Sequence, residues 1–180
     1  MKQILLLAIS VFCLFFVDAQ SYTPVDAGSN VRFTIKNFGS TVAGNFNGLS
    51  GFILYNATKI TATIFNVTIN AGTVNTGNAA RDKHLKKEDY FNVAAYNKIS
   101  FLSSKITATA DATVFKVDGY LTIKGIKKII SFPFTVLPNV TGGYIFTGAF
   151  AINRREFGVG GGSLVLADNL DVQLKVNTIK

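Results

Sequence analysis

Apolar and polar residues alternate with a period of two along nearly the whole chain after its first twenty residues, and this feature limits the fold more than any other. In one segment Val31, Phe33 and Ile35 share one parity, and polar residues occupy the positions between them. Comparable rows recur in segments 42–46, 61–69, 115–123, 130–136, 144–152 and 170–176. A period of two is typical of half-buried β-strands. The sequence therefore predicts an all-β domain.

The spacing of these rows predicts about eight antiparallel strands. Turn signals separate them at 37–40, 124–125 and 138–143. Closing such a sheet into a β-barrel removes the unpaired edges that an open sheet exposes. Segment 78–91 breaks the alternation, because it has helix-forming residues and clustered charge. We expect it to form a short helix or two across one end of the barrel, capped by Asn75, Thr76 or Asn78.

Residues 1–19 are typical of a secretory signal peptide. Lys2 gives a basic start, 4–17 is an almost unbroken apolar run, and Ala19 is the small residue that a signal peptidase requires. The alternative is an anchor that stays attached, although the run is short for a spanning helix. Cys13 is the single cysteine, and Phe12 before it does not fit a lipoprotein. The domain, residues 20–180, then has no thiol, and we expect it in the periplasm or outside the cell.

The composition favours a large apolar interior and a basic surface. The chain has 16 phenylalanines, and only Phe12, Phe15 and Phe16 lie in the signal segment. The formal net charge is +8, which the domain keeps because Lys2 and Asp18 cancel. A basic surface suits transient contact with an anionic membrane, or it serves general solubility alone. Export argues against nucleic acid as a partner, and pairing into a homodimer is left open.

A barrel of eight strands is either filled by its own side chains or wide enough for one small ligand. Gly44, Gly119 and Gly148 interrupt the apolar rows, and we predict that they leave room in the interior. The alternative is that they relieve strand coiling in a filled barrel. The residues predicted to line a ligand tunnel are Phe33, Ile35, Phe46, Phe52, Phe101, Phe115, Leu121, Ile123, Phe132, Phe134, Phe146 and Phe150.

Four stretches resemble, in the same order, the motifs of one known family. They are Gly-Asn-Phe at 44–46 with Gly-Phe-Ile at 51–53, the run from Thr-Gly-Asn-Ala-Ala-Arg-Asp-Lys-His-Leu to Asp-Tyr-Phe at 76–91, Asp-Gly-Tyr-Leu-Thr-Ile-Lys-Gly-Ile-Lys-Lys at 118–128, and Asn-Arg-Arg-Glu-Phe-Gly at 153–158. Together they cover nearly all of the domain and resemble the YceI-like, or polyisoprenoid-binding, family. The resemblance implies a lipocalin-like barrel whose tunnel takes an isoprenoid or a similar long-chain amphiphile. The family often has a histidine where this chain has Gly-Ser-Asn at 28–30, so the identity of the lipid stays open.

Three basic residues are candidates to hold the polar head of such a lipid: Arg81 and His84 on the helical segment, and Arg154 on the penultimate strand. An arginine can bind a phosphate through two parallel hydrogen bonds. Each candidate also has a purely structural interpretation. Arg81 can pair with Asp82, His84 can cap or pack, and Arg154 can face solvent beside Arg155.

The chain offers little for catalysis. It has one histidine, no thiol in the domain and scattered acidic residues, so we expect no catalytic residues, no metal site and no cofactor besides a bound lipid. The predicted function is an exported, non-catalytic binding protein that holds an amphiphilic lipid for transport, storage or sensing. The alternative is a structural or surface-interaction barrel with a filled core and no ligand.

Overall fold

A computed structural model describes residues 20–180, and the predicted signal peptide lies outside these residues. The described chain contains nine strands and four short helical segments. The strands are β1 (Gln20–Asn37), β2 (Ser40–Phe46), β3 (Ser50–Tyr55), β4 (Ile64–Asn70), β5 (Lys98–Ala108), β6 (Phe115–Ile123), β7 (Ile126–Pro138), β8 (Tyr144–Asn153) and β9 (Leu166–Ile179). The helical segments are η1 (Ile60–Ala62), η2 (Ala71–Thr73), α1 (Ala79–Leu85) and η3 (Arg154–Phe157).

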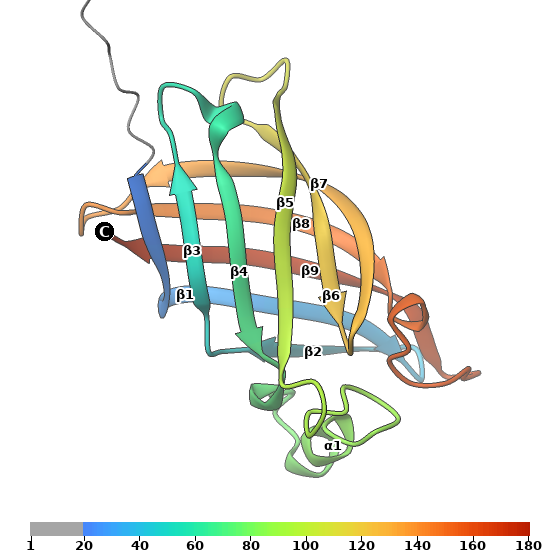
Figure 1. The fold of residues 1–180 in the computed structure, drawn as a ribbon. Coiled ribbons are helices and arrows are strands. Elements are labelled where there is room, and N and C mark those ends of the chain that lie inside the picture. The colour runs from blue at the N-terminus through green and yellow to red at the C-terminus, as the bar shows by residue number, and fades with distance from the viewer. Residues whose placement is uncertain (1–19) are drawn as a thin grey trace, which may run out of the picture.

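The strands form a closed antiparallel barrel (Figure 1). Each strand from β3 to β9 pairs with the next, and β1 closes the sheet by pairing with both β3 and β9. Strands β2 and β3 run in the same direction, separated only by residues 47–49, and they pair with the two halves of β1. They act as one interrupted strand, so the barrel has eight members. The predicted fold class is therefore confirmed.

Strand β1 bends sharply, and side-chain hydrogen bonds at the bend fix the break between β2 and β3. Its pairing with β9 shifts register between Val25 and Asn30, and Gly28 within this bulge has a positive φ of 77°. A bulge of this kind bends a strand. The Asp26 carboxylate at the corner accepts hydrogen bonds of 2.9 Å from the backbone N–H groups of Gly48 and Leu49. The corner of β1 and the break between β2 and β3 are thereby joined.

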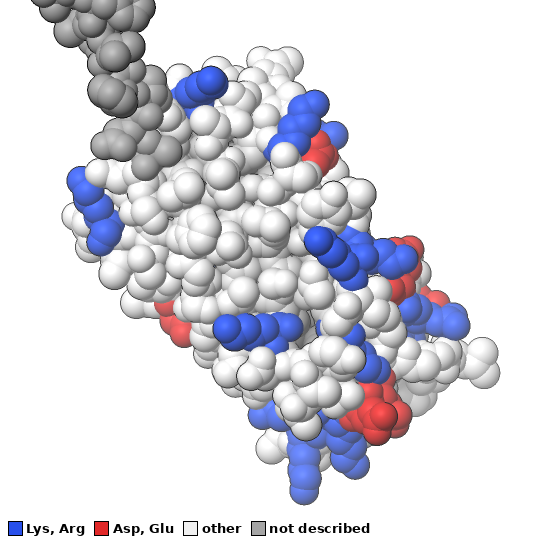
Figure 2. All heavy atoms as spheres, in the orientation of Figure 1, with Lys and Arg blue, Asp and Glu red and all other residues white. Residues whose placement is uncertain are grey.

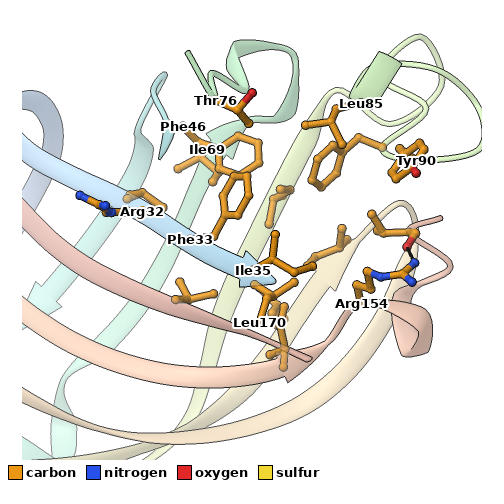
Figure 3. A pocket seen from close by; sticks show the side chains of 18 of the residues that line it. Arg32, Phe33, Ile35, Phe46, Ile69, Thr76, Leu85, Tyr90, Arg154 and Leu170 are labelled. Atoms are coloured by element: carbon orange, nitrogen blue, oxygen red, sulfur yellow. Dashed lines mark hydrogen bonds between the residues drawn. The ribbon is translucent and has the colours of Figure 1, made fainter. Parts of the chain in front are cut away.

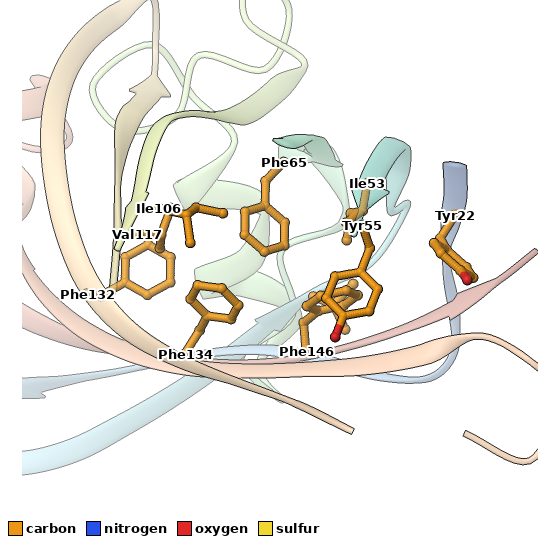
Figure 4. Close-up of a cluster of buried hydrophobic side chains, with 10 residues drawn as sticks. Tyr22, Ile53, Tyr55, Phe65, Ile106, Val117, Phe132, Phe134 and Phe146 are labelled. Atoms are coloured by element: carbon orange, nitrogen blue, oxygen red, sulfur yellow. The ribbon is translucent and has the colours of Figure 1, made fainter. Parts of the chain in front are cut away.

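One half of the interior is filled by side chains, and we call it the packed half (Figure 4). The Phe65 ring makes edge-to-face contacts with Phe134 and Phe146, with ring centroids 5.2 and 5.3 Å apart. Such pairs add about 0.5–1.5 kcal/mol beyond the area that they bury. The buried residues of the packed half are Tyr22, Ile53, Tyr55, Phe65, Ile106, Val117, Phe132, Phe134, Phe146 and Val176.

The opposite end of the barrel carries the segment that joins β4 to β5, residues 71–97, which we call the cap (Figure 1). Helix α1 begins in this segment, and the Asn78 side chain caps it by accepting a 3.0 Å hydrogen bond from the backbone N–H of Arg81. The helix ends at Leu85, and turns follow it, so it is shorter than the predicted segment 78–91. The predicted position of the cap is confirmed.

The outer surface mixes scattered charges with uncharged side chains (Figure 2). Lys and Arg side chains gather at the cap end in this view, with acidic side chains beside them. Between residues 20 and 180, no helix is long and apolar enough to cross a membrane.

Candidate functional site

A cavity of about 540 Å³ occupies the half of the barrel next to the cap (Figure 3). Its walls come from strands β1, β2, β4 to β9, the cap and the loop before β9. The lining residues that are exposed to solvent include His84, Ser163 and Val165, and they mark one place where the cavity opens. We call the opening between His84 of the cap and residues 163–165 the mouth. Earlier in the same loop, the Gly160 N–H donates a 2.7 Å hydrogen bond to the Asp89 carbonyl and joins the loop to the cap. The interior is thus filled at one end and hollow at the other.

Most residues predicted to line a tunnel do line this cavity. The period-two rows place their side chains inside because successive residues of a strand point to opposite faces of the sheet. The predicted residues found along its walls are Phe33, Ile35, Phe46, Phe101, Leu121, Ile123, Phe132 and Phe150.

Three further predicted residues face the interior but not the cavity. Phe134 and Phe146 are buried in the packed half, and the partly buried Phe115 packs against Phe134 with ring centroids 5.6 Å apart. Their assignment to the tunnel is wrong, because residue parity tells which face is inside but not how far along the barrel axis a residue lies.

The assignment of Phe52 to the tunnel is wrong for a different reason. It lies on the outer face with 38% of its surface exposed, whereas its neighbour Ile53 is 1% exposed. Segment 51–55 has apolar residues at consecutive positions, so its sequence permits either parity. The choice is made by Tyr55, whose ring packs inside against Tyr144 at a centroid distance of 4.4 Å.

The sequence predicted that Gly44, Gly119 and Gly148 leave room in the interior, but the structure shows a phenylalanine ring next to each of them, Phe132 in the case of Gly148. A Cβ on Gly44 would lie 2.4 Å from the Phe33 ring, and one on Gly119 would lie 2.6 Å from the Phe101 ring. A phenylalanine ring therefore lies over each of these glycines. The rings occupy the room that the glycines provide, so they lie against the barrel wall rather than across the cavity.

The cavity ends at a floor that it shares with the packed half. Phe132 and Val176 belong to both, and Phe101 and Phe150 line the cavity while packing against the buried cluster. The Phe132 ring lies between the other two rings, with centroids 5.4 Å from Phe101 and 4.7 Å from Phe150. These four residues form the floor. The cavity therefore does not continue into the packed half.

Arg81 lies in the cap at the edge of the cavity. Its Nε donates to the Thr76 hydroxyl at 2.7 Å, and its Nη2 donates to the Thr76 carbonyl at 2.9 Å. Asp82 accepts a 2.9 Å hydrogen bond from the Thr76 backbone N–H and another from its hydroxyl. The expected pairing of Arg81 with Asp82 is therefore indirect, through Thr76. No other partner for the Arg81 guanidinium is found within residues 20–180, so Nη1 is available to a ligand.

His84 also lines the cavity at the mouth and is exposed. Its ring packs edge-on against Tyr90 with a centroid distance of 4.9 Å. This is the packing that the structural interpretation predicted, yet His84 remains exposed at the mouth. His84 and Arg81 thus bring polar groups to the same end of the cavity.

Arg154 is a structural residue, contrary to its prediction as a head-group ligand. It is 3% exposed, and each of its five N–H groups faces an acceptor in the protein. These acceptors are the carbonyl oxygens of Val159, Gly161, Leu166 and Ala167 and the Asp168 carboxylate. Although Arg154 lines the cavity, it has no donor left for a ligand, and it holds the 158–165 loop beside the mouth.

Several lining residues were missed as site residues. The alternating row of β9, Leu170, Val172, Leu174 and Val176, was a visible signal of inward position, and it supplies one whole wall. The apolar cap residues Leu85, Tyr90 and Phe91 cover the cavity and had no such signal. Their positions depend on how the turns after α1 fold back over the barrel.

The ionisable groups with shifted pKa values lie away from the cavity. Burial raises the pKa of Tyr22 and of Tyr55 in the packed half, and the neighbouring Tyr144 adds to both effects. A hydrogen bond from the Ser131 side chain lowers the pKa of Asp118 on the outer face. Among residues 20–180, no group of three or more His, Cys, Asp or Glu side chains is placed to hold a metal ion.

The sequence matches the YceI-like domain over residues 22–178. The chain belongs to the YceI-like family. A UPF0312 protein of Shewanella putrefaciens is 30% identical over 168 residues, which cover 88% of this chain and 87% of that protein. A UPF0312 protein of Pseudomonas paraeruginosa is 31% identical over 135 residues, which cover 72% of this chain and 70% of that protein.

Several solved structures share the barrel. BcnA of Burkholderia cenocepacia superposes with a TM-score of 0.79 and 25% identity, over 87% of this chain and 99% of that one. The YceI protein of Campylobacter jejuni gives a TM-score of 0.68 at 28% identity, over 78% of this chain and 86% of that one. A polyisoprenoid-binding domain of Saccharophagus degradans gives a TM-score of 0.68 at 13% identity, over 88% and 97%, which shows a common fold.

Proposed function

We propose that this chain is an exported, non-catalytic carrier that holds one amphiphilic lipid, with its tail in the cavity and its polar head at the mouth. The observation that supports this best is the polarity of the cavity. Aliphatic and aromatic side chains line most of its depth, and two basic side chains with donors available to a ligand, Arg81 and His84, lie at the cap. A third basic lining residue, the exposed Arg32, lies on β1. A molecule that matches this arrangement is apolar along its length and polar at one end.

The size of the cavity suits one hydrocarbon chain. Small-molecule sites in proteins usually measure about 300–1,000 Å³, and this cavity measures about 540 Å³. Each methylene that leaves water contributes about 0.8 kcal/mol, so about ten of them contribute roughly 8 kcal/mol before the entropic cost of binding. The tail therefore supplies most of the affinity.

The head group sets the orientation of the lipid. The Nη1 group of Arg81 and the exposed edge of His84 provide donors for a phosphate, carboxylate or carbonyl oxygen. A hydrogen bond to a charged group contributes about 1.5–3 kcal/mol. Since the floor closes the other end, the tail enters first and the head remains at the cap.

One structural neighbour supports isoprenoids as the tail class. The Saccharophagus degradans neighbour is described as a polyisoprenoid-binding domain, and its barrel has the same fold at low sequence identity. In this chain the floor at Phe132 limits the length of the tail, so we propose a short prenyl or acyl chain. Transport between membranes is the role that suits a cavity open at one end, and we place the protein in the periplasm or outside the cell.

A ligand-binding assay with a cavity-filling variant tests this proposal. A fluorescent fatty acid and a fluorescent prenyl phosphate serve as probes. Val172→Trp fills the cavity from β9, whereas Gln173→Trp adds the same side chain to the outer face of the same strand. We expect both probes to bind the wild type and Gln173→Trp but not Val172→Trp. If the wild type rejects both probes and organic extraction of the purified protein yields no lipid, the proposal fails.

A further inference from the structure

An exposed phenylalanine stands at the tip of the β1–β2 hairpin, in a position where aromatic residues are rare. Phe38 and Gly39 form a two-residue turn in which both φ angles are positive, 49° and 74°, and Phe38 is 76% exposed. Such turns strongly favour Asn-Gly, because bulky side chains are disfavoured at positive φ. Phe38 is therefore unfavourable both for its backbone conformation and for its exposure to water. Neither property is explained by the fold.

A second apolar tip lies beside this hairpin. The backbone N–H of Phe38 donates a 2.9 Å hydrogen bond to the carbonyl of Val165. Val165 is 40% exposed, and Leu164 before it is fully exposed. The side chains of Phe38, Leu164 and Val165, which we call the apolar rim, thus project from two adjacent loops. Val165 also lines the cavity, so the apolar rim borders the mouth.

We infer that the apolar rim docks onto an anionic lipid bilayer and brings the mouth of the cavity to the membrane surface. This inference rests on the proposed lipid-carrier function, and it assigns the surface through which the lipid enters and leaves. Apolar side chains at loop tips insert into the interface of a bilayer, where their burial favours binding. A lipid that passes from the bilayer into the cavity at this point is not exposed to water.

Basic side chains around the apolar rim complement an anionic membrane. Lys36 lies two residues from Phe38 on the same hairpin, and Arg155 approaches Gly162 in the loop that carries Leu164. On the cap, Lys83 is next to His84. Of the acids in this region, Asp168 is paired with Arg154 and Arg155 and so repels an anionic surface less. Asp89, whose carbonyl is bonded by Gly160 of this loop, and Glu156 are exposed acids that reduce the local positive charge. Basic residues close to an anionic membrane each add to the attraction.

The turn at Phe38 provides a test that separates docking from folding. Phe38→Asn installs the residue that this turn favours, so we expect the melting temperature to stay the same or rise. The same change removes an inserting side chain, and we expect vesicle binding to weaken on the order of tenfold. Leu164→Ser is expected to weaken it by a similar factor. A residue with only a structural role cannot produce opposite effects on stability and on membrane binding.

The experiment is flotation of the protein with vesicles of phosphatidylglycerol and phosphatidylcholine, compared with vesicles of phosphatidylcholine alone. Val140→Ser is the matched control, because Val140 is as exposed as Leu164 but lies in the β7–β8 turn at the opposite end of the barrel. We expect the wild type and Val140→Ser to float with the anionic vesicles. The two rim variants should stay in the bottom fraction of the gradient. All four proteins should still bind the fluorescent probes in solution.

The inference is overturned if the rim variants float as well as the wild type, or if Val140→Ser is equally impaired. It is also overturned if the wild type does not bind anionic vesicles. A dimer in sedimentation that Phe38→Asn dissociates would overturn it too, because the apolar rim would then bind a second copy of the chain. Probe binding in solution is measured separately. Its failure would refute the lipid-carrier function, and a failure of flotation alone would refute only the docking surface.

Discussion

Replacing Phe132 by alanine is expected to lengthen the lipid tail that the protein accepts. The Phe132 ring forms the centre of the floor, between Phe101 and Phe150, and beyond it lies the packed half. Without this ring, the cavity extends into the space that the ring occupied. A longer tail can then enter, whereas in the wild type the same tail must fold back or remain in water.

The size of the effect follows from the atoms removed. The ring has six carbons, and because a core relaxes only partly around a deleted side chain, about half of that space stays open. Three or four additional tail carbons at about 0.8 kcal/mol each contribute roughly 2.5–3 kcal/mol, or about a hundredfold in affinity as an upper limit. The deletion itself lowers the free energy of unfolding by about 3–5 kcal/mol.

The assay is a titration with acyl and prenyl chains of increasing length, read by displacement of a fluorescent probe. The wild-type affinity should rise with each added carbon and then level off, and Phe132→Ala should level off at a longer chain. Phe134→Ala is the control, because Phe134 lies two residues away on β7 in the packed half and does not line the cavity. It should lose similar stability without a shift in chain length. Phe132→Leu provides a milder variant if the alanine variant does not fold.

The prediction is refuted if the wild type and Phe132→Ala level off at the same chain length. In that case the floor does not set the limit. If Phe134→Ala shifts the length limit as much as Phe132→Ala, the packed half rearranges to admit the tail, and the division of the interior into two parts is wrong.

Three further predictions concern the walls, the loop at the mouth and the packed half. Gly44→Val should drive the Phe33 ring into the cavity and weaken probe binding at least tenfold, whereas Gly161→Val, where a Cβ meets open space, should leave binding unchanged. Arg154→Met should lower the free energy of unfolding in urea by about 3 kcal/mol or more, since it leaves several buried acceptors unpaired, and a loss below about 1 kcal/mol would contradict this. The pKa values of Tyr22 and Tyr55 are raised, so the folded state holds these protons more tightly than the unfolded state; stability should be unaffected below about pH 10 and fall as the pH rises through the raised pKa values. Absorbance titration of tyrosinate checks this, and it fails if all six tyrosines titrate together at the ordinary pKa.

The sequence predicted the barrel because its main determinant is local. The parity of Val31, Phe33 and Ile35 is visible because apolar residues occupy three alternate positions. The turns at 37–40 and 124–125 each have a glycine, Gly39 and Gly125, at a position with positive φ. Where two adjacent residues are both apolar, as at Phe52 and Ile53, parity is ambiguous, and a long-range contact of Tyr55 decides it. The sequence did not reveal that the Arg154 side chain is fully hydrogen-bonded, because the acceptors lie five to fourteen residues later in a loop without a periodic pattern.

The parity of a residue does not predict how far along the barrel axis its side chain lies. This position along the axis decides whether the side chain lines the cavity or belongs to the packed half. Strands β3, β4 and β8 place aromatic residues at one level, where Tyr55, Phe65 and Phe146 meet across the axis. At the other level, β1 and β9 pair Ile35 with Leu170 and Phe33 with Val172. At this level the Phe33 ring lies against the wall over Gly44, and the interior beside it is hollow. The register of β1 against β9, which shifts between Val25 and Asn30, sets which of their side chains share a level, and this long-range pairing is not visible in the parity of either strand.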